Sequence, residues 1–157
     1  MTTTLPPLRV YDVSAATTAV FGRVRGAVRQ HQLTIDGPRH NGAPGEYPTP
    51  GELLLTAAAA CGAEVLQVLA RDAGVALERV AVAVRGSIDA AMQPRADVTV
   101  FTEVELWFRM QGPTAEQAAM LVAGFQRRCP VYGSLAVASG RTTVHVETEP
   151  AGLPPAK

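Results

Sequence analysis

One segment of this sequence, residues 50–73, constrains the fold more than any other, because it predicts a long helix that is apolar on nearly every side. Thr49 and Glu52 form a Thr-x-x-Glu capping box around a proline at the first helical position, and Gly74 ends the pattern. The residues that share one face at three- and four-residue steps are Leu54, Ala57, Ala58, Cys61, Val65 and Val68. Leucines and alanines also lie off that face, so we expect this helix in the middle of the fold.

Strand patterns stand on both sides of this helix. Alternating or β-branched residues mark them, and the segments are 10–37, 77–88, 98–110 and 142–148. Glycine and proline recur through 37–50, which predicts a loop. Grouped strands and helices predict an α+β fold rather than an alternating α/β fold.

Two shorter helices are expected between the last two strands. Thr114 and Gln117 form a second capping box, and the helix that follows ends at about Arg128, because a residue before proline leaves the helical region. Pro130 then opens a short helix that ends near Gly140. The length of 157 residues fits a single domain over 1–157, with a folded core of about 10–149, a loose N-terminus and a proline-rich C-terminal tail.

Composition excludes several classes of partner. The formal net charge is +0, which argues against binding to nucleic acid or to an anionic membrane surface. We expect no membrane span, since the longest apolar run, 53–63, is about half the required length. The N-terminus lacks a signal-peptide pattern, which predicts a cytoplasmic protein whose thiols are mostly reduced. With 47% hydrophobic and only 18% charged residues, the chain is expected to cover apolar surface by forming a homo-oligomer.

The two cysteines are open to three interpretations: inert core thiols, metal ligands or a redox pair. Metal binding is disfavoured because the chain has no Cys-x-x-Cys pair and no histidine at a ligand spacing. Cys61 lies mid-helix on an apolar face, which alone favours an inert thiol. Cys129 precedes Pro130 at a helix N-cap, where amides and the helix dipole stabilise a thiolate. Arg127 and Arg128 either add positive charge there or are solvated surface groups.

Two motifs resemble the OsmC/Ohr family. Tyr47-Pro-Thr-Pro-Gly-Glu-Leu-Leu-Leu-Thr-Ala-Ala-Ala-Ala-Cys61 is similar to the helix start that leads to the family's first cysteine. Arg128-Cys-Pro-Val-Tyr132 resembles its second motif. Together with the order of elements, the likeness covers about residues 17–149.

The resemblance implies a fold and an activity. The implied fold is a long central helix packed against curved antiparallel sheets, in an intertwined homodimer. The implied activity is thiol-dependent reduction of organic hydroperoxides, and possible substrates include hydrogen peroxide. Cys61 would attack the peroxide and become a sulfenic acid, Cys129 would condense with it to a disulfide, and an external dithiol such as a lipoyl group would reduce that bond. No cofactor and no metal are implied.

The resemblance also implies a cation beside Cys61. In the hydroperoxide-reducing branch an arginine from an early strand holds the thiolate, and a glutamate at the helix start holds the arginine. Arg23 matches that arginine best, with Arg25 and Arg29 as substitutes that alternation places on the same face. The glutamate position falls on Gly51, and its neighbour Glu52 is the candidate replacement, although the capping box already accounts for it.

Two alternatives remain open at this stage. The missing carboxylate at Gly51 and the closer likeness of residues 31–61 to the general OsmC-like branch favour a binding, regulatory or stress-response protein with weak or no peroxidase activity. The other alternative is a structural thiol pair in a dimer without redox function. The aromatic residues are either ordinary core or the lining of a site for an alkyl peroxide; they are Phe101, Trp107, Phe108, Phe125 and Tyr132.

Overall fold

The computed structural model describes residues 8–151 and divides the chain into two compact units, Met1–Leu53 and Leu54–Lys157. The expectation of a single domain over 1–157 stays a prediction. The predicted loose N-terminus and proline-rich tail fall almost entirely on residues 1–7 and 152–157, which lie outside the described residues.

The first unit is built on a three-stranded antiparallel sheet in the order β1-β2-β3. Its strands are β1 (Ser14–Thr17), β2 (Arg23–Val28) and β3 (His31–Asp36), and a 3₁₀ helix, η1 (Arg39–Asn41), follows. Gly22 enters β2 with a φ of +74°, and a Cβ there would lie 2.5 Å from the Cβ of Ala43. The first two strands are therefore connected by a turn that only glycine suits.

Helix α1 (Pro50–Ala73) confirms the long helix that the sequence predicts. Its first turn has the predicted capping geometry: the Glu52 carboxylate accepts hydrogen bonds from the Thr49 amide (2.7 Å) and the Thr49 hydroxyl (2.8 Å). By length and composition α1 could cross a membrane, although the core helix of a soluble protein passes the same test. Ala58, Gly62, Leu66 and Ala70 form its buried stripe.

The second unit contains a three-stranded sheet in the order β4-β5-β6. The strands are β4 (Arg79–Ser87), β5 (Glu103–Gln111) and β6 (Arg141–Glu149); a 3₁₀ helix, η2 (Ala90–Met92), lies between the first two. β4 pairs with β5 antiparallel, whereas β6 pairs with β5 in parallel. The expectation of purely antiparallel sheets is therefore wrong for this pair. Two helices connect β5 to β6, and such a crossover returns the chain in the same direction.

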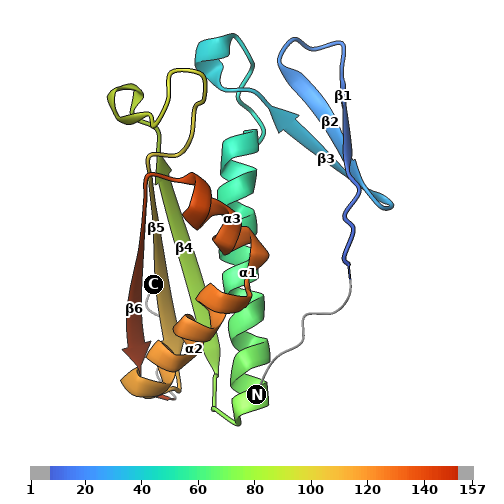
Figure 1. The fold of residues 1–157 in the computed structure, drawn as a ribbon. Helices are drawn as coiled ribbons and strands as arrows, with labels where there is room; N and C mark the ends of the chain where they lie inside the picture. The colour runs from blue at the N-terminus through green and yellow to red at the C-terminus, as the bar shows by residue number, and fades with distance from the viewer. Residues whose placement is uncertain (1–7, 152–157) are drawn as a thin grey trace. The chain divides into compact units, whose positions relative to one another are not determined.

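Those connecting helices are α2 (Ala115–Arg128) and α3 (Pro130–Ala138). Figure 1 shows α1 and α2 on one side of the β4-β5-β6 sheet. Both helices contact Phe108 of β5: its ring lies 5.1 Å from the ring of Phe125 in α2, and a Cβ on Gly62 of α1 would lie 3.0 Å from it. The core therefore lies between the two helices and the face of the sheet that carries Phe108.

The predicted strand 98–110 begins later than expected, at Glu103. The side chain of Gln93 forms hydrogen bonds with both backbone polar groups of Val100. Its Oε1 accepts from the Val100 backbone N–H (2.8 Å), and its Nε2 donates to the Val100 carbonyl (3.2 Å). Val98 and Val100 have the alternation of a strand, but a side chain satisfies the backbone that a neighbouring strand would otherwise pair with.

Candidate functional site

The structure joins Cys61 and Cys129 in a disulfide, although 68 positions separate them in the sequence. Their Cα atoms are 6.6 Å apart, within the range that a disulfide can bridge. Cys61 lies in the middle of α1, and Cys129 is the single residue between α2 and α3. The packing of α1 and α2 on the same face of the sheet therefore brings the two sulfur atoms together.

Cys129 caps two helices at once. Its backbone amide donates to the carbonyl of Phe125 and closes α2 (2.9 Å), while its Sγ accepts a hydrogen bond from the amide of Tyr132 in the first turn of α3 (3.3 Å). Pro130 at the first position of α3 forces the break between the helices. The second sulfur is thus held where the positive end of a helix dipole lies.

The surroundings of this pair are apolar. Cys129 is only 3% exposed and belongs to the buried core, against which Cys61 and Tyr132 pack. The Tyr132 ring lies 5.1 Å from Phe125, and its hydroxyl accepts a hydrogen bond from Gln126 (3.0 Å). Phe108 and Phe125 are fully buried, which supports their role as ordinary core. A reduced Cys129 would be shielded from water and would depend on the Tyr132 amide for stabilisation of its charge.

Next to Cys129, Arg127 and Arg128 are both exposed on the last turn of α2. This exposure favours the interpretation that both arginines are solvated surface groups.

Arg23, the first residue of β2, lies in a cluster of charges in the first unit. Its Nε and Nη2 donate to the two carboxylate oxygens of Asp36 (2.8 and 3.0 Å), and Nη2 also donates to Glu46 (2.6 Å). The guanidinium carbon lies 4.7 Å from the ring centre of Tyr47. Asp36 has no exposed surface and also accepts from the amides of Glu46 (2.8 Å) and Tyr47 (3.3 Å).

These contacts keep both partners ionised. The hydrogen bonds from Arg23 hold the pKa of Asp36 well below its usual value, and the bonds to Asp36 and Glu46 hold the pKa of Arg23 above its usual value. Asp36 fixes two donor groups of the guanidinium, and the third nitrogen, Nη1, has no hydrogen bond to any residue within 8–151. The guanidinium is therefore held firmly by its Nε and Nη2 atoms.

The other predicted site residues lie elsewhere. The Glu52 carboxylate accepts hydrogen bonds from the backbone amide and the hydroxyl of Thr49, and these bonds lower the pKa of Glu52. Arg25 shares a strand face with Arg23 but is exposed. The prediction that Arg29 continues that alternation is wrong, because Arg29 lies beyond the end of β2 in a turn with a φ of +53°. The roles of Arg23 and Glu52 stay predictions.

The sequence interpretation missed Asp36 and Glu46. A signal for Asp36 was present: Arg23 and Asp36 are direct cross-strand partners at the ends of β2 and β3, a position where opposite charges interact favourably. Glu46 comes from the loop after η1, and only the folded path of that loop brings it to Arg23.

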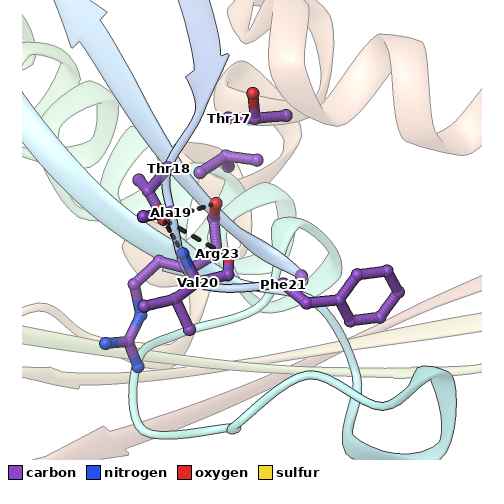
Figure 2. Close-up of a pocket in the computed structure, with 8 residues that line it drawn as sticks. Thr17, Thr18, Ala19, Val20, Phe21 and Arg23 are labelled. Atoms are coloured by element: carbon purple, nitrogen blue, oxygen red, sulfur yellow. Dashed lines mark hydrogen bonds between the residues drawn. The ribbon is translucent and has the colours of Figure 1, made fainter.

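A hollow of about 440 Å³ lies at the turn between β1 and β2, lined by Thr17 to Val24 (Figure 2). Hydrogen bonds from Thr18 to the carbonyls of Val20 (3.3 Å) and Arg23 (3.1 Å) close this turn. Figure 2 shows the Phe21 ring and the Arg23 guanidinium pointing away from each other. All of its lining belongs to one hairpin of the first unit.

Within residues 8–151 no group of three or more histidine, cysteine, aspartate or glutamate side chains could hold a metal ion. A model of the OsmC-like protein family matches residues 43–146, a span that includes both cysteines and about two thirds of the chain. This chain belongs to the OsmC-like family. None of the curated proteins matches this OsmC-like sequence.

Solved structures share the OsmC-like fold at low sequence identity. An OsmC-like protein from Mycoplasma pneumoniae is 19% identical, with a TM-score of 0.74 over 91% of this chain and 98% of that one. An organic hydroperoxide resistance protein OsmC from Legionella pneumophila is 22% identical (TM-score 0.69, 90% and 98%). Another organic hydroperoxide resistance protein, from Elizabethkingia anophelis, is 18% identical (TM-score 0.72, 93% and 99%). These likenesses confirm the α+β OsmC-like fold.

Proposed function

We propose that this OsmC-like protein reduces organic hydroperoxides to alcohols with the cysteine pair as its redox centre. The observation that carries the proposal is the disulfide between Cys61 and Cys129, which joins the middle of α1 to the start of α3. The family and the names of the Legionella and Elizabethkingia structures support an organic hydroperoxide as the substrate class.

The reaction begins with Cys61 as a thiolate. Its sulfur attacks one peroxide oxygen, the O–O bond breaks, and the other oxygen takes up a proton and leaves as an alcohol. Cys61 is now a sulfenic acid. The Cys129 thiolate attacks the Cys61 sulfur, hydroxide leaves as water after protonation, and the disulfide forms. An external dithiol, such as a lipoyl group, then supplies two electrons and two protons to restore both thiols.

Arg23 is the cation that we assign to the Cys61 thiolate. The pairing of Arg23 with Cys61 comes from the family motif. The hydrogen bonds within the first unit support one part of it, the requirement that a carboxylate hold the arginine. Asp36 and Glu46 hold the guanidinium by its Nε and Nη2 atoms, so the carboxylate that the motif lacks at Gly51 is supplied from outside the helix. We propose Asp36 and Glu46, rather than Glu52, for this role.

The test of this function is peroxide consumption by the purified protein. With an alkyl hydroperoxide and a dithiol we expect catalytic loss of peroxide, faster with dihydrolipoamide than with a monothiol such as glutathione. Hydrogen peroxide and several alkyl peroxides, each assayed by loss of peroxide over time, identify the preferred substrate. Consumption no faster than the reductant alone achieves would refute the proposal.

We further propose that the protein is a cytoplasmic homodimer. Helix α1 is apolar on most sides, yet only one stripe of it is buried within the chain, and Leu54 remains 43% exposed. Uncovered apolar surface of this kind favours association with a second copy. Light scattering after gel filtration should give about twice the chain mass of 16.5 kDa. A mass of one chain at micromolar concentration would contradict the dimer.

The second candidate function is a binding or regulatory protein with weak peroxidase activity. The absence of a side chain at Gly51 favours it, together with the commitment of Glu52 to the helix cap. The two candidates differ in the pKa of the Cys61 thiol, which the first requires to lie well below the usual value of about 8.5. The rate of alkylation of Cys61 as a function of pH measures this pKa and decides between them.

A further inference from the structure

We infer that the reducing dithiol attacks Cys61, and that Cys129 is the leaving group, stabilised by the backbone amide of Tyr132. This inference rests on the proposed redox function and adds the direction in which the disulfide is opened. Nothing in the family match distinguishes the two sulfurs in the reduction step, whereas their surroundings in the second unit differ in access and in hydrogen bonding.

Access favours attack on Cys61. The Cys129 side chain is enclosed in the core and only 3% of that residue is exposed, whereas Cys61 is half-buried. An incoming sulfur must approach along the line of the S–S bond, on the side opposite the leaving sulfur. Cys129 belongs to the buried core cluster that includes Phe125, so packed side chains rather than solvent surround it.

Cys129 also has a hydrogen bond that would stabilise it as the leaving group. The Tyr132 amide donates to Cys129 Sγ at 3.3 Å, at the N-terminus of a nine-residue helix. A neutral disulfide sulfur is a weak acceptor, so this bond strengthens as negative charge develops on Sγ, and it therefore lowers the barrier. Cys61 lies in the interior of α1, where the neighbouring amides already donate to carbonyls one turn earlier. Arg23, which we assign to the Cys61 thiolate, would favour Cys61 as the leaving group, so the enclosure of Cys129 decides the direction of attack.

The step balances as a thiol–disulfide exchange. The thiolate of the dithiol forms a bond to Cys61 Sγ, the Cys61–Cys129 bond breaks, and its electron pair leaves on Cys129 Sγ. The second thiol of the reductant, once deprotonated, attacks the reductant sulfur that is bonded to Cys61. This step releases Cys61 as a thiolate, the form that reacts with peroxide. The reductant leaves as a cyclic disulfide, and the two protons that it lost remain available to Cys129 and to solvent.

The test maps the first adduct on the wild-type chain. The purified protein, oxidised with diamide, is exposed briefly to 2-mercaptoethanol, which forms a mixed disulfide but has no second thiol of its own to release it. Excess N-ethylmaleimide then stops the exchange and alkylates the freed thiol in one step. Peptide mass spectrometry should find mercaptoethanol on Cys61 and the alkyl group on Cys129. The reverse pattern, or equal amounts of the two adducts, would overturn the inference.

A variant pair tests the amide. Tyr132→Pro removes the N–H within the first turn of α3, where proline is tolerated, and should slow reduction of the disulfide by dithiothreitol about tenfold. Tyr132→Ala loses the ring as the proline variant does but keeps the N–H, and should be reduced about tenfold faster than the proline variant. Equal rates for the two variants would overturn the role of Tyr132, and if the proline variant fails to fold the adduct map still decides the direction of attack.

The adduct map does not involve peroxide, so its outcome is separate from that of the proposed function. A chain that gives the Cys61 adduct but consumes no peroxide supports the inference and refutes the peroxidase. A chain that consumes peroxide but gives the Cys129 adduct supports the peroxidase and refutes the inference.

Discussion

Cys61→Ser is expected to abolish peroxide consumption, whereas Cys129→Ser should still reduce one equivalent of peroxide per chain. Serine at position 61 leaves no thiolate that can attack the O–O bond, because its hydroxyl stays protonated at neutral pH. In Cys129→Ser the first step is intact, and Cys61 stops as a sulfenic acid that has no second thiol in the chain to condense with. Single-turnover assays without reductant, with the sulfenic acid trapped by dimedone and detected by mass spectrometry, measure the difference.

Each variant serves as the control for the other, since both remove one sulfur atom and the same disulfide. Loss of stability from the missing bond therefore affects them equally, and only the chemical role of each sulfur distinguishes them. A Cys61→Ser variant that still consumes one equivalent of peroxide would assign the first attack to Cys129 and contradict the proposed mechanism.

Phe108→Ala is expected to lower the free energy of unfolding by about 3–5 kcal/mol, the usual cost of removing a buried aromatic ring. Phe108 of β5 is 1% exposed. Its ring lies between Gly62 of α1, where the helix comes close to the strand, and Phe125 of α2. Urea unfolding followed by circular dichroism, at one protein concentration and with the disulfide intact, measures the loss.

Phe21→Ala is the matched control, because it makes the same chemical change at a residue that is 77% exposed in a turn of the first unit. Its effect should stay within about 0.5 kcal/mol. If the two variants lose equal stability, the core that we place between the helices and the β4-β5-β6 sheet is not the main source of stability.

The cysteine pair shows how far a family motif and local sequence patterns reach. The motifs around Cys61 and Cys129 predicted both the family and the helix that carries the first cysteine, and the family match and α1 confirm them. The bond between the two sulfurs was only implied by the resemblance, because residues 68 positions apart are brought together by helix packing rather than by any local rule.

The sequence by itself determined the elements whose signals are local. The capping box at Thr49 and Glu52 and the apolar periodicity after it are enough to define α1, and the proline after Cys129 is enough to separate α2 from α3. Local backbone preferences and short-range hydrogen bonds decide these features, so they can be read without knowledge of the rest of the chain.

Only the tertiary structure decided the parallel pairing of β6 with β5, the capture of Val100 by Gln93 and the carboxylates that hold Arg23. Each depends on which distant groups satisfy a backbone amide, a carbonyl or a charge once water is excluded. Many residues can supply such a partner in principle, and only the packed arrangement of the whole unit selects one of them.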